Sequence, residues 1–301
     1  MSFKNAMGGT ELMHNQLMSV LPQELKDKFS IFNYPVNAEE GKKLIFWNQL
    51  SYDQPAVEIL KDEEFINQID LFVFVSHWQA EKFRQTFGIP AYKTAVIKNA
   101  CLGVEQRDFG SRDKVRICYT STPFRGLDVL LGAWELLKPQ NAELHVFSSC
   151  QIYGEEFGQN DVHYQELYDK CNELEGVTYR GSIPNDELRK ELPTFDILAY
   201  PSTFEETSCI AVIEAISAGL KVICSSLGAL PETTEGWATI YPYYPNKEFH
   251  AIKFAELLEK EIKLVENGFD HTNQVEIYKE RWSWETREKE WIELLSKMES
   301  I

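Results

Sequence analysis

The sequence of 301 residues lacks the features that mark several classes of protein. Its apolar runs are short, as at residues 71–75, so we expect neither a transmembrane helix nor a signal peptide. Basic residues are scarce: 30 Lys and Arg face 47 Asp and Glu, and a formal charge of −17 argues against general nucleic-acid binding. The six cysteines are scattered without a Cys-x-x-Cys pair, which predicts reduced, mostly buried thiols in a cytoplasmic protein.

Two short motifs are also missing. No Gly-x-Gly-x-x-Gly follows a strand-like run, which argues against a nicotinamide-dependent enzyme. No Asp-x-Asp occurs, so the sequence offers no motif for a divalent metal, and we expect no metal site. The length and the 44% hydrophobic fraction leave room for two α/β domains of moderate size.

Strand-like runs alternate with helical stretches, which predicts parallel sheets built from βαβ units. Strands are expected at residues 29–34, 43–47, 71–75, 94–97, 115–119, 143–147, 177–181, 197–200, 221–224 and 239–241. Helices are expected at residues 9–20, 77–87, 126–137, 162–174, 185–192, 209–218, 247–267 and 284–298.

The stretch 197–224 organises the chain as a strand, a loop, a helix and a second strand. Thr207 and Ser208 are natural N-caps for the helix 209–218, and Gly219 suits the position after its end. In open α/β sheets such a loop lies at the C-terminal edge of the strands, where ligands bind. This unit is therefore the predicted ligand site.

Two acids in this unit point to the kind of ligand. Glu206 lies in the loop, and Glu214 lies more than one turn inside the helix. Between them, backbone N–H groups at the helix end suit a diphosphate, while the acids could hold hydroxyls on either side of it. A sugar nucleotide has that layout, although each acid could also be an ordinary surface acid. The residues expected to supply the backbone N–H groups are Thr207, Ser208, Cys209 and Ile210.

The residue pattern of this stretch resembles that of the glycosyltransferase group 1 family, the retaining GT-B enzymes. In that family Pro-Ser precedes a Glu, seven residues separate it from a Glu-Ala, and small-Gly and Val-Ile follow. Glu205 would shift the register by one residue, but the seven-residue spacing selects Glu206. The matching positions are Pro201, Ser202, Glu206, Glu214, Ala215, Ala218, Gly219, Val222, Ile223, Gly228 and Glu232.

The resemblance implies a GT-B fold, in which two Rossmann-like domains face each other across a cleft. Residues 1–103 would form the N-terminal domain on the acceptor side, and residues 104–301 the nucleotide-sugar-binding domain. Only residues 1–7 precede the Gly-Gly loop, so the first strand is expected to be short, absent or replaced and the N-terminal domain shortened. The C-terminal helices are expected to pack back on the first domain.

Three places in the first domain are candidates for the donor site. Gly8 and Gly9 open the helix 9–20, and they match the family's Gly-Gly loop, although a plain turn would also explain them. Asn48 stands where family members often carry a His near the donor sugar. His77 begins a helix behind a Ser76–Gln79 capping-box pattern, which favours capping and packing over a role in the site.

In the second domain, Arg125-Gly126 matches the family's Lys-Gly pair on the donor diphosphate. The family's earlier Arg is missing, and the hydroxyls of Ser121 and Thr122 lie in its place. The backbone near Gly181 and Ile183 matches the region that holds the nucleotide base.

The resemblance implies a glycosyltransferase that moves a hexosyl or pentosyl group to an acceptor hydroxyl with retention of configuration and without a metal. Glu206 and Arg125 would be catalytic. The donor would be a UDP- or GDP-sugar acting as co-substrate, with no other cofactor. The acceptor stays open between a saccharide, a lipid-linked sugar, a protein and a modified nucleic acid. Two alternatives remain: a non-catalytic sugar-nucleotide binder, and a nucleotide-sugar epimerase or hydrolase of the same fold.

Overall fold

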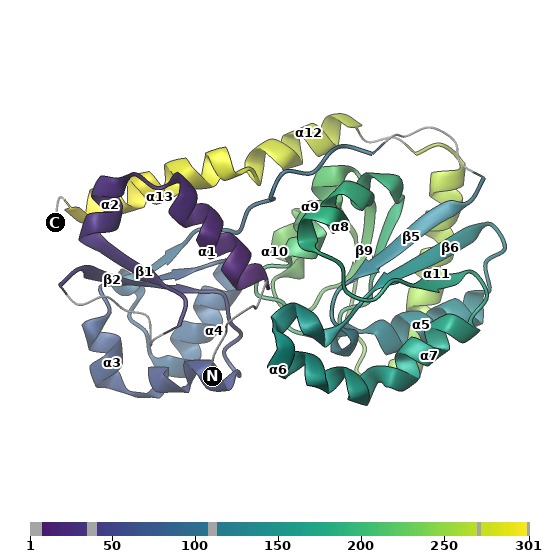
Figure 1. Ribbon diagram of the computed structural model, residues 1–301, viewed down its shortest axis with the longest axis horizontal. Helices are drawn as coiled ribbons and strands as arrows, with labels where there is room; N and C mark the ends of the chain where they lie inside the picture. The colour runs from purple at the N-terminus through teal and green to yellow at the C-terminus, as the bar shows by residue number, and fades with distance from the viewer. Residues whose placement is uncertain (1–7, 35–40, 108–112, 270–271, 300–301) are drawn as a thin grey trace.

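The computed structural model describes residues 8–34, 41–107, 113–269 and 272–299. The expectation about a first strand in residues 1–7 lies outside these ranges. Within them, two α/β domains lie side by side, and two C-terminal helices run along one side of the molecule (Figure 1). No helix of the described residues combines the length and the apolar character needed to cross a membrane.

The first domain has a sheet of strands in the order β1-β2-β3-β4, and every pairing is parallel. Buried apolar side chains from both faces of this sheet form two clusters, one of which includes Phe46, Phe72 and Phe74. The strands are β1 (Phe29–Phe32), β2 (Lys43–Asn48), β3 (Leu71–Phe74) and β4 (Thr94–Val96), and the helices are α1 (Gly9–Val20), α2 (Gln23–Lys28), α3 (Glu63–Gln68) and α4 (His77–Phe87).

The second domain has a larger parallel sheet in the order β10-β9-β8-β5-β6-β7. The chain order reverses where β5 lies between β8 and β6, and such a switch point opens a crevice at the carboxyl ends of the strands. The strands are β5 (Val115–Thr120), β6 (Ala142–Phe147), β7 (Val177–Tyr179), β8 (Ile197–Tyr200), β9 (Lys221–Ser225) and β10 (Thr239–Tyr241). The helices are α5 (Leu127–Leu137), α6 (Glu155–Gly158), α7 (Gln165–Glu173), α8 (Asn185–Glu191), α9 (Ile210–Ala218), α10 (Leu230–Thr234) and α11 (Lys247–Glu266).

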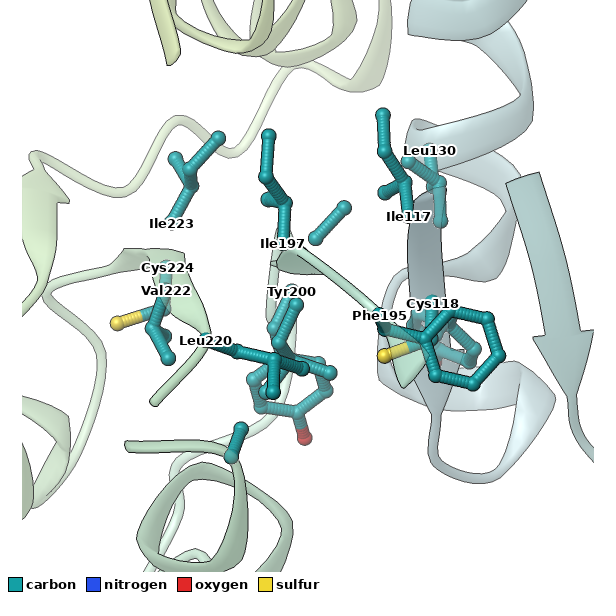
Figure 2. Packing of buried hydrophobic residues seen from close by; sticks show 14 of the residues in the cluster. Ile117, Cys118, Leu130, Phe195, Ile197, Tyr200, Leu220, Val222, Ile223 and Cys224 are labelled. Carbon is teal, nitrogen blue, oxygen red and sulfur yellow. The ribbon is translucent and has the colours of Figure 1, made fainter. Parts of the chain in front are cut away.

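The central strands of this sheet are buried on both faces, as their continuous apolar runs predict. Tyr200 is fully buried at the end of β8, and its ring lies below the sheet in the view of Figure 2. Alternate residues of neighbouring strands share a face, so Ile117, Ile197 and Ile223 stand together on the opposite side (Figure 2).

Most predicted elements occur within a few residues of their expected bounds. The predicted helix 162–174 is shorter, because a 3-10 turn (Gln159–Tyr164) precedes α7. Helix α12 (Thr272–Arg281) was not predicted, although Val275, Tyr278 and Trp282 recur at helical spacing and are buried.

The C-terminal helix α13 (Trp284–Glu299) contributes to the core of the first domain, whereas α12 packs against α9 of the second. The Trp291 and Trp47 rings meet edge to face with their centroids 5.1 Å apart. Trp282 and Trp284 are also buried, and their large side chains belong to the apolar cores of the second and first domains. Helix α13 thus completes the core of the first domain.

We predict that Trp291→Ala lowers the free energy of unfolding by about 3–5 kcal/mol, because it removes a fully buried indole from that core. Urea unfolding measures the change. Lys289→Ala, on the exposed face of the same helix, is the control and should have little effect. Equal losses in the two variants would contradict the docking of α13.

Candidate functional site

The loop between β8 and α9 is held by backbone contacts to a distant segment. Glu206 pairs in parallel with Gly228, and the Ala229 N–H donates to the Glu206 carbonyl oxygen at 2.7 Å. Gly228 has φ +64°, and a Cβ there would lie 2.5 Å from the backbone nitrogen and oxygen of Glu206. Only glycine permits this close approach.

The Glu206 side chain is buried at this point, with 4% exposure. Its Oε1 accepts a hydrogen bond from Arg125 Nη1 at 3.0 Å and a second from the Tyr200 hydroxyl. Burial is the largest effect and disfavours the charge of Arg125, but the Glu206 carboxylate and the neighbouring acidic groups together raise the pKa of the guanidinium. The two residues predicted as catalytic therefore form an ion pair between a buried carboxyl group and a half-buried guanidinium.

Arg125 ends a 3-10 turn (Pro123–Arg125) that is pressed against the end of β8. Gly126 has φ +111°, and a Cβ there would lie 2.1 Å from the Pro201 carbonyl oxygen. The guanidinium stacks on Phe204, with its carbon 4.5 Å from the ring centroid, and its Nη2 donates to the Tyr153 hydroxyl at 2.9 Å. Its Nε has no hydrogen-bond partner among the described residues, so one donor is left for a ligand.

Tyr153 was not among the predicted site residues. It follows β6 in a 3-10 turn (Cys150–Tyr153), where the sequence predicted neither a helix nor a strand. Asp161 shapes this turn, since its carboxylate accepts from Ser149 Oγ at 2.5 Å and from Cys150 N at 2.8 Å. The carboxyl ends of all strands in a parallel sheet lie at the same edge, where ligands bind. A tyrosine in the loop after β6 could therefore have been predicted as a site residue.

Glu214 lies inside α9 with 2% exposure, and its Oε1 has no hydrogen-bond partner among the described residues. Burial raises the pKa of this carboxyl to about 7, and the Arg189 guanidinium opposes the shift. Arg189, in α8, has its Nη1 3.8 Å from Glu214 Oε1 and was also absent from the predicted site. A buried acid with an unused oxygen is suited to a hydroxyl ligand.

The predicted N-caps of the helix are wrong. Helix α9 starts at Ile210, and the cap position belongs to Cys209, which makes no side-chain cap bond. Thr207 Oγ1 instead donates to the Gln49 carbonyl oxygen of the first domain at 3.1 Å, and Ser208 Oγ has no partner among the described residues. The Thr207 hydroxyl thus binds a residue of the other domain and does not cap its own helix. Gly219 ends the helix with φ +89°, as predicted.

The structure gives no support to a donor contact by Asn48. This side chain is fully buried, and its amide makes both of its bonds with the backbone of Leu50. The neighbouring Gln49 exchanges two side-chain hydrogen bonds of 3.0 Å with Asn99. The strand end expected to face the donor sugar is therefore occupied by internal bonds.

The Gly-Gly loop lies against the second domain. Gly8 is the N-cap of α1, and a Cβ at Gly9 would lie 2.7 Å from Ile210 Cδ1 at the start of α9. A Cβ at Gly8 would lie 3.1 Å from a ring carbon of Tyr153. The N-termini of α1 and α9 therefore meet beside Tyr153, which binds Arg125.

The remaining predicted residues lie along the edge of the second sheet. Thr122 is buried with its Oγ1 unpartnered among the described residues, and Ser121 Oγ is 3.5 Å from the Tyr200 hydroxyl. Gly181, with φ +64°, and the half-buried Ile183 follow β7, which is two strands away from β5. Their backbone shares the edge but lies apart from Arg125.

His77 begins α4, and Ser76 Oγ accepts from the Gln79 N–H at 3.1 Å, as the capping pattern predicts. The Gln79 side chain does not complete the capping box, because it accepts from Val75 N at 2.8 Å. The backbone N–H of His77 is bound to Glu232 of the second domain.

Comparison with known proteins finds sugar transferases among the proteins that this chain resembles. Residues 115–260 match the family described as glycosyl transferases group 1. The chain is 27% identical over 204 residues to a component of the phosphatidylinositol N-acetylglucosaminyltransferase of Arabidopsis thaliana, covering 64% of this chain and 43% of that protein. It is 22% identical over 182 residues to the O-antigen chain mannosyltransferase B of Escherichia coli, covering 56% and 46%. The chain thus spans less than half the length of these curated relatives.

Solved structures share the whole fold at low identity. A glycosyltransferase from Rickettsia africae superimposes with a TM-score of 0.69 at 13% identity, over 97% of this chain and 83% of that one. The sucrose-phosphate synthase of Thermosynechococcus elongatus gives 0.66 at 16% identity, over 97% and 79%. Anabaena HepE in complex with UDP-glucose gives 0.61 at 18% identity, over 85% and 72%. The chain has the GT-B fold, and the prediction of two Rossmann-like domains is confirmed.

We predict that Gly228→Ala destabilises the protein far more than its left-handed backbone conformation alone requires, because the new Cβ collides with the backbone of Glu206. Gly88→Ala is the matched control, since Gly88 has φ +69° and open space around it. The control should cost about 1 kcal/mol, and Gly228→Ala several times that. Equal losses in urea unfolding would contradict the contact.

We predict that Glu214→Gln changes the pH dependence of stability. The folded-state pKa of Glu214 is raised, so its stabilising protonation is complete below about 4.5 and is lost as pH rises to about 7. The Gln variant should therefore gain about 1–3 kcal/mol of unfolding free energy relative to the parent at pH 8, but not at pH 4.5. Denaturation at both pH values tests this, with the exposed Glu187→Gln as control. A pH-independent difference would contradict the assignment.

Proposed function

We propose that this protein transfers a glycosyl group from a nucleoside diphosphate sugar, a UDP- or GDP-sugar, to an acceptor hydroxyl. The observation that carries the proposal is the arrangement of two buried acids and one half-buried cation around the start of α9. Glu206 and Arg125 lie on one side of this helix end and Glu214 lies behind it. The relatives named above are sugar transferases, and HepE was solved with UDP-glucose.

The unused polar atoms fit a diphosphate donor. Arg125 Nε, Thr122 Oγ1 and Ser208 Oγ are buried without partners among the described residues, and all lie at the sheet edge. A diphosphate there would accept hydrogen bonds from these groups and from the free backbone N–H groups of α9. Glu214 Oε1 would accept from ribose hydroxyls, and the backbone of Gly181 and Ile183 would hold the base.

Leaving-group departure is the difficult step of this reaction. As the bond from the anomeric carbon to the diphosphate oxygen breaks, negative charge grows on the diphosphate and positive charge on the sugar ring. Arg125 stabilises the first charge, and its rigid bonds to Glu206 and Tyr153 reduce reorganisation during the step. Glu206 uses Oε1 for Arg125, so its Oε2 side would meet the sugar.

We further propose that configuration is retained and that no metal is needed. The acceptor hydroxyl would attack from the face that the diphosphate leaves, and the departing phosphate oxygen would take the acceptor proton. This step needs no protein base. The cationic Arg125 supplies the charge that a metal would otherwise provide. The acceptor would enter from the first domain.

We predict that Glu206→Gln and Glu214→Gln have different kinetic effects. Ribose leaves with the nucleotide, so Glu214→Gln should chiefly weaken UDP or GDP binding, by about 2 kcal/mol. The sugar becomes cationic only in the transition state, so Glu206→Gln should lower kcat about 10²-fold. The measurements are calorimetry with the nucleotides and turnover of UDP- and GDP-sugars in the presence of EDTA.

A thermal-shift screen of the same sugar nucleotides identifies the donor first, because a bound ligand raises the melting temperature. Glu187→Gln, an exposed acid, is the control. Wild-type turnover in both site variants would refute the assignment. Donor binding without turnover would favour a non-catalytic binder, and release of free sugar with every acceptor would favour a hydrolase.

A further inference from the structure

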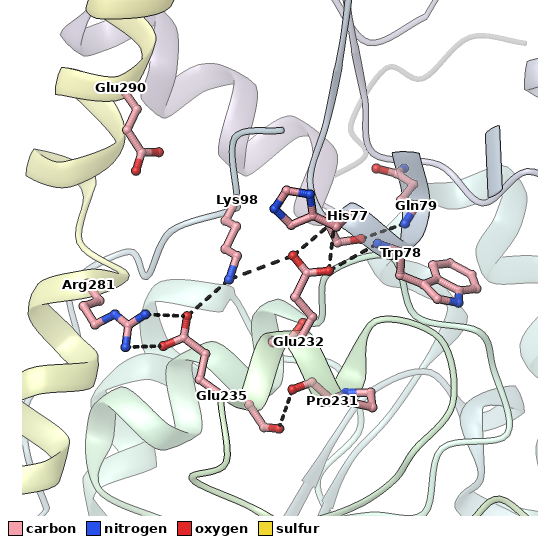
Figure 3. Close-up of polar contacts among 12 residues, drawn as sticks. His77, Trp78, Gln79, Lys98, Pro231, Glu232, Glu235, Arg281 and Glu290 are labelled. Atoms are coloured by element: carbon pink, nitrogen blue, oxygen red, sulfur yellow. Dashed lines mark hydrogen bonds and ion pairs between the residues drawn. The ribbon is translucent and has the colours of Figure 1, made fainter. Parts of the chain in front are cut away.

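The N-terminus of α4, in the first domain, is capped by a side chain of the second domain. Glu232, in α10, accepts from the His77 N–H at 2.9 Å and from the Trp78 N–H at 3.2 Å (Figure 3). Ser76 already binds the Gln79 N–H, so the first three N–H groups of the helix are all satisfied. A carboxylate is also favoured there by the helix dipole. This contact exists only while the domains are together.

Basic residues support the carboxylate from the other side. Lys98 Nζ lies 3.9 Å from Glu232 Oε1 and 3.2 Å from Glu235 Oε1, and it sits 5.0 Å from the centre of the Trp282 ring. Arg281 pairs with Glu235 at 3.1 Å (Figure 3). Lys98 belongs to the segment after β4, so the network joins both domains. The Glu232 side chain is thus half-buried, and the nearby Lys98 ammonium group balances its charge.

A second carboxylate reaches the same corner of the first domain. The Tyr52 hydroxyl donates to Glu205 Oε2 at 2.9 Å. The Tyr52 and Trp78 rings meet edge to face with centroids 6.4 Å apart, and Lys82 Nζ lies over both rings. Glu205 and Glu232 therefore hold neighbouring parts of the first domain.

Both carboxylates are attached to the segments that hold Glu206. Glu205 precedes it in the chain, and Glu232 lies four residues after Gly228, whose backbone pairs with Glu206. A separation of the domains would therefore pull on both sides of the Glu206 backbone. Beside the Lys98 network, the crossover between the domains adds a backbone contact, in which the Cys101 N–H donates to the Trp282 carbonyl oxygen at 2.8 Å.

We propose that Glu205 and Glu232 are positioning residues that clamp the first domain against the Glu206 loop. Their partners, Tyr52 and the N-terminus of α4, are polar groups that water can satisfy, so the contact is able to open and close. This inference rests on the proposed function for its effect on catalysis. The clamp itself is a property of the two domains and can be measured without turnover.

We predict that weakening both contacts of the clamp, those of Glu205 and Glu232, separates the two domains and slows catalysis without weakening nucleotide binding. Tyr52→Phe removes one hydrogen bond and Glu232→Gln removes one charge, and neither residue is part of the proposed donor site. The double variant should lose about tenfold in kcat, with UDP or GDP affinity within about twofold of the parent. Small-angle scattering should show a larger radius of gyration for the double variant.

Asp62→Asn is the matched control. Asp62 also caps a helix with a carboxylate, accepting from the Glu64 N–H at 2.9 Å, but both residues belong to the first domain. It should leave kcat and the radius of gyration unchanged. A double variant as compact as the parent overturns the clamp, whatever its activity. If the parent itself neither binds nor turns over a sugar nucleotide, the proposed function fails, while the scattering comparison still decides the clamp.

Discussion

The ion pair between the half-buried Arg125 and the buried Glu206 is the interaction on which the rest of the site depends. A buried charge pair is stable only when its geometry is good and its remaining polar atoms are satisfied. Tyr200 and Tyr153 supply the additional hydrogen bonds, and Phe204 covers the guanidinium. The pair fixes the positions of a cation and an anion before any ligand arrives, which is what electrostatic catalysis requires.

The pair in turn depends on two glycines. Gly126 brings the Arg125 turn against the end of β8, and Gly228 brings a distant loop against the Glu206 backbone. Any side chain at either position would meet backbone atoms, which cannot move aside as a flexible side chain could. The two loops are therefore packed closely, and Arg125 Nη1 reaches Glu206 Oε1 at 3.0 Å.

The two domains are joined by contacts of two kinds. Helix α12 packs on the second domain and α13 completes the core of the first, so apolar burial makes that connection permanent. The contacts from Glu205, Thr207 and Glu232 to the first domain are hydrogen bonds to groups that water can also bind. The second kind is the one that the proposed clamp uses.

The sequence by itself determined what depends on neighbours along the chain. Apolar periodicity located β8 and β10, the Ser76 cap began α4, and Gly219 ended α9, because these features follow from local backbone and side-chain preferences. The spacing of Glu206 and Glu214 also placed both acids correctly on the loop and helix. Only the tertiary structure decided the partners: Arg125 for Glu206, Arg189 for Glu214, Gln49 for Thr207, and the internal bonds of Asn48. These partners lie on different elements, and the packing of the sheets and domains, which no local pattern encodes, brings them together.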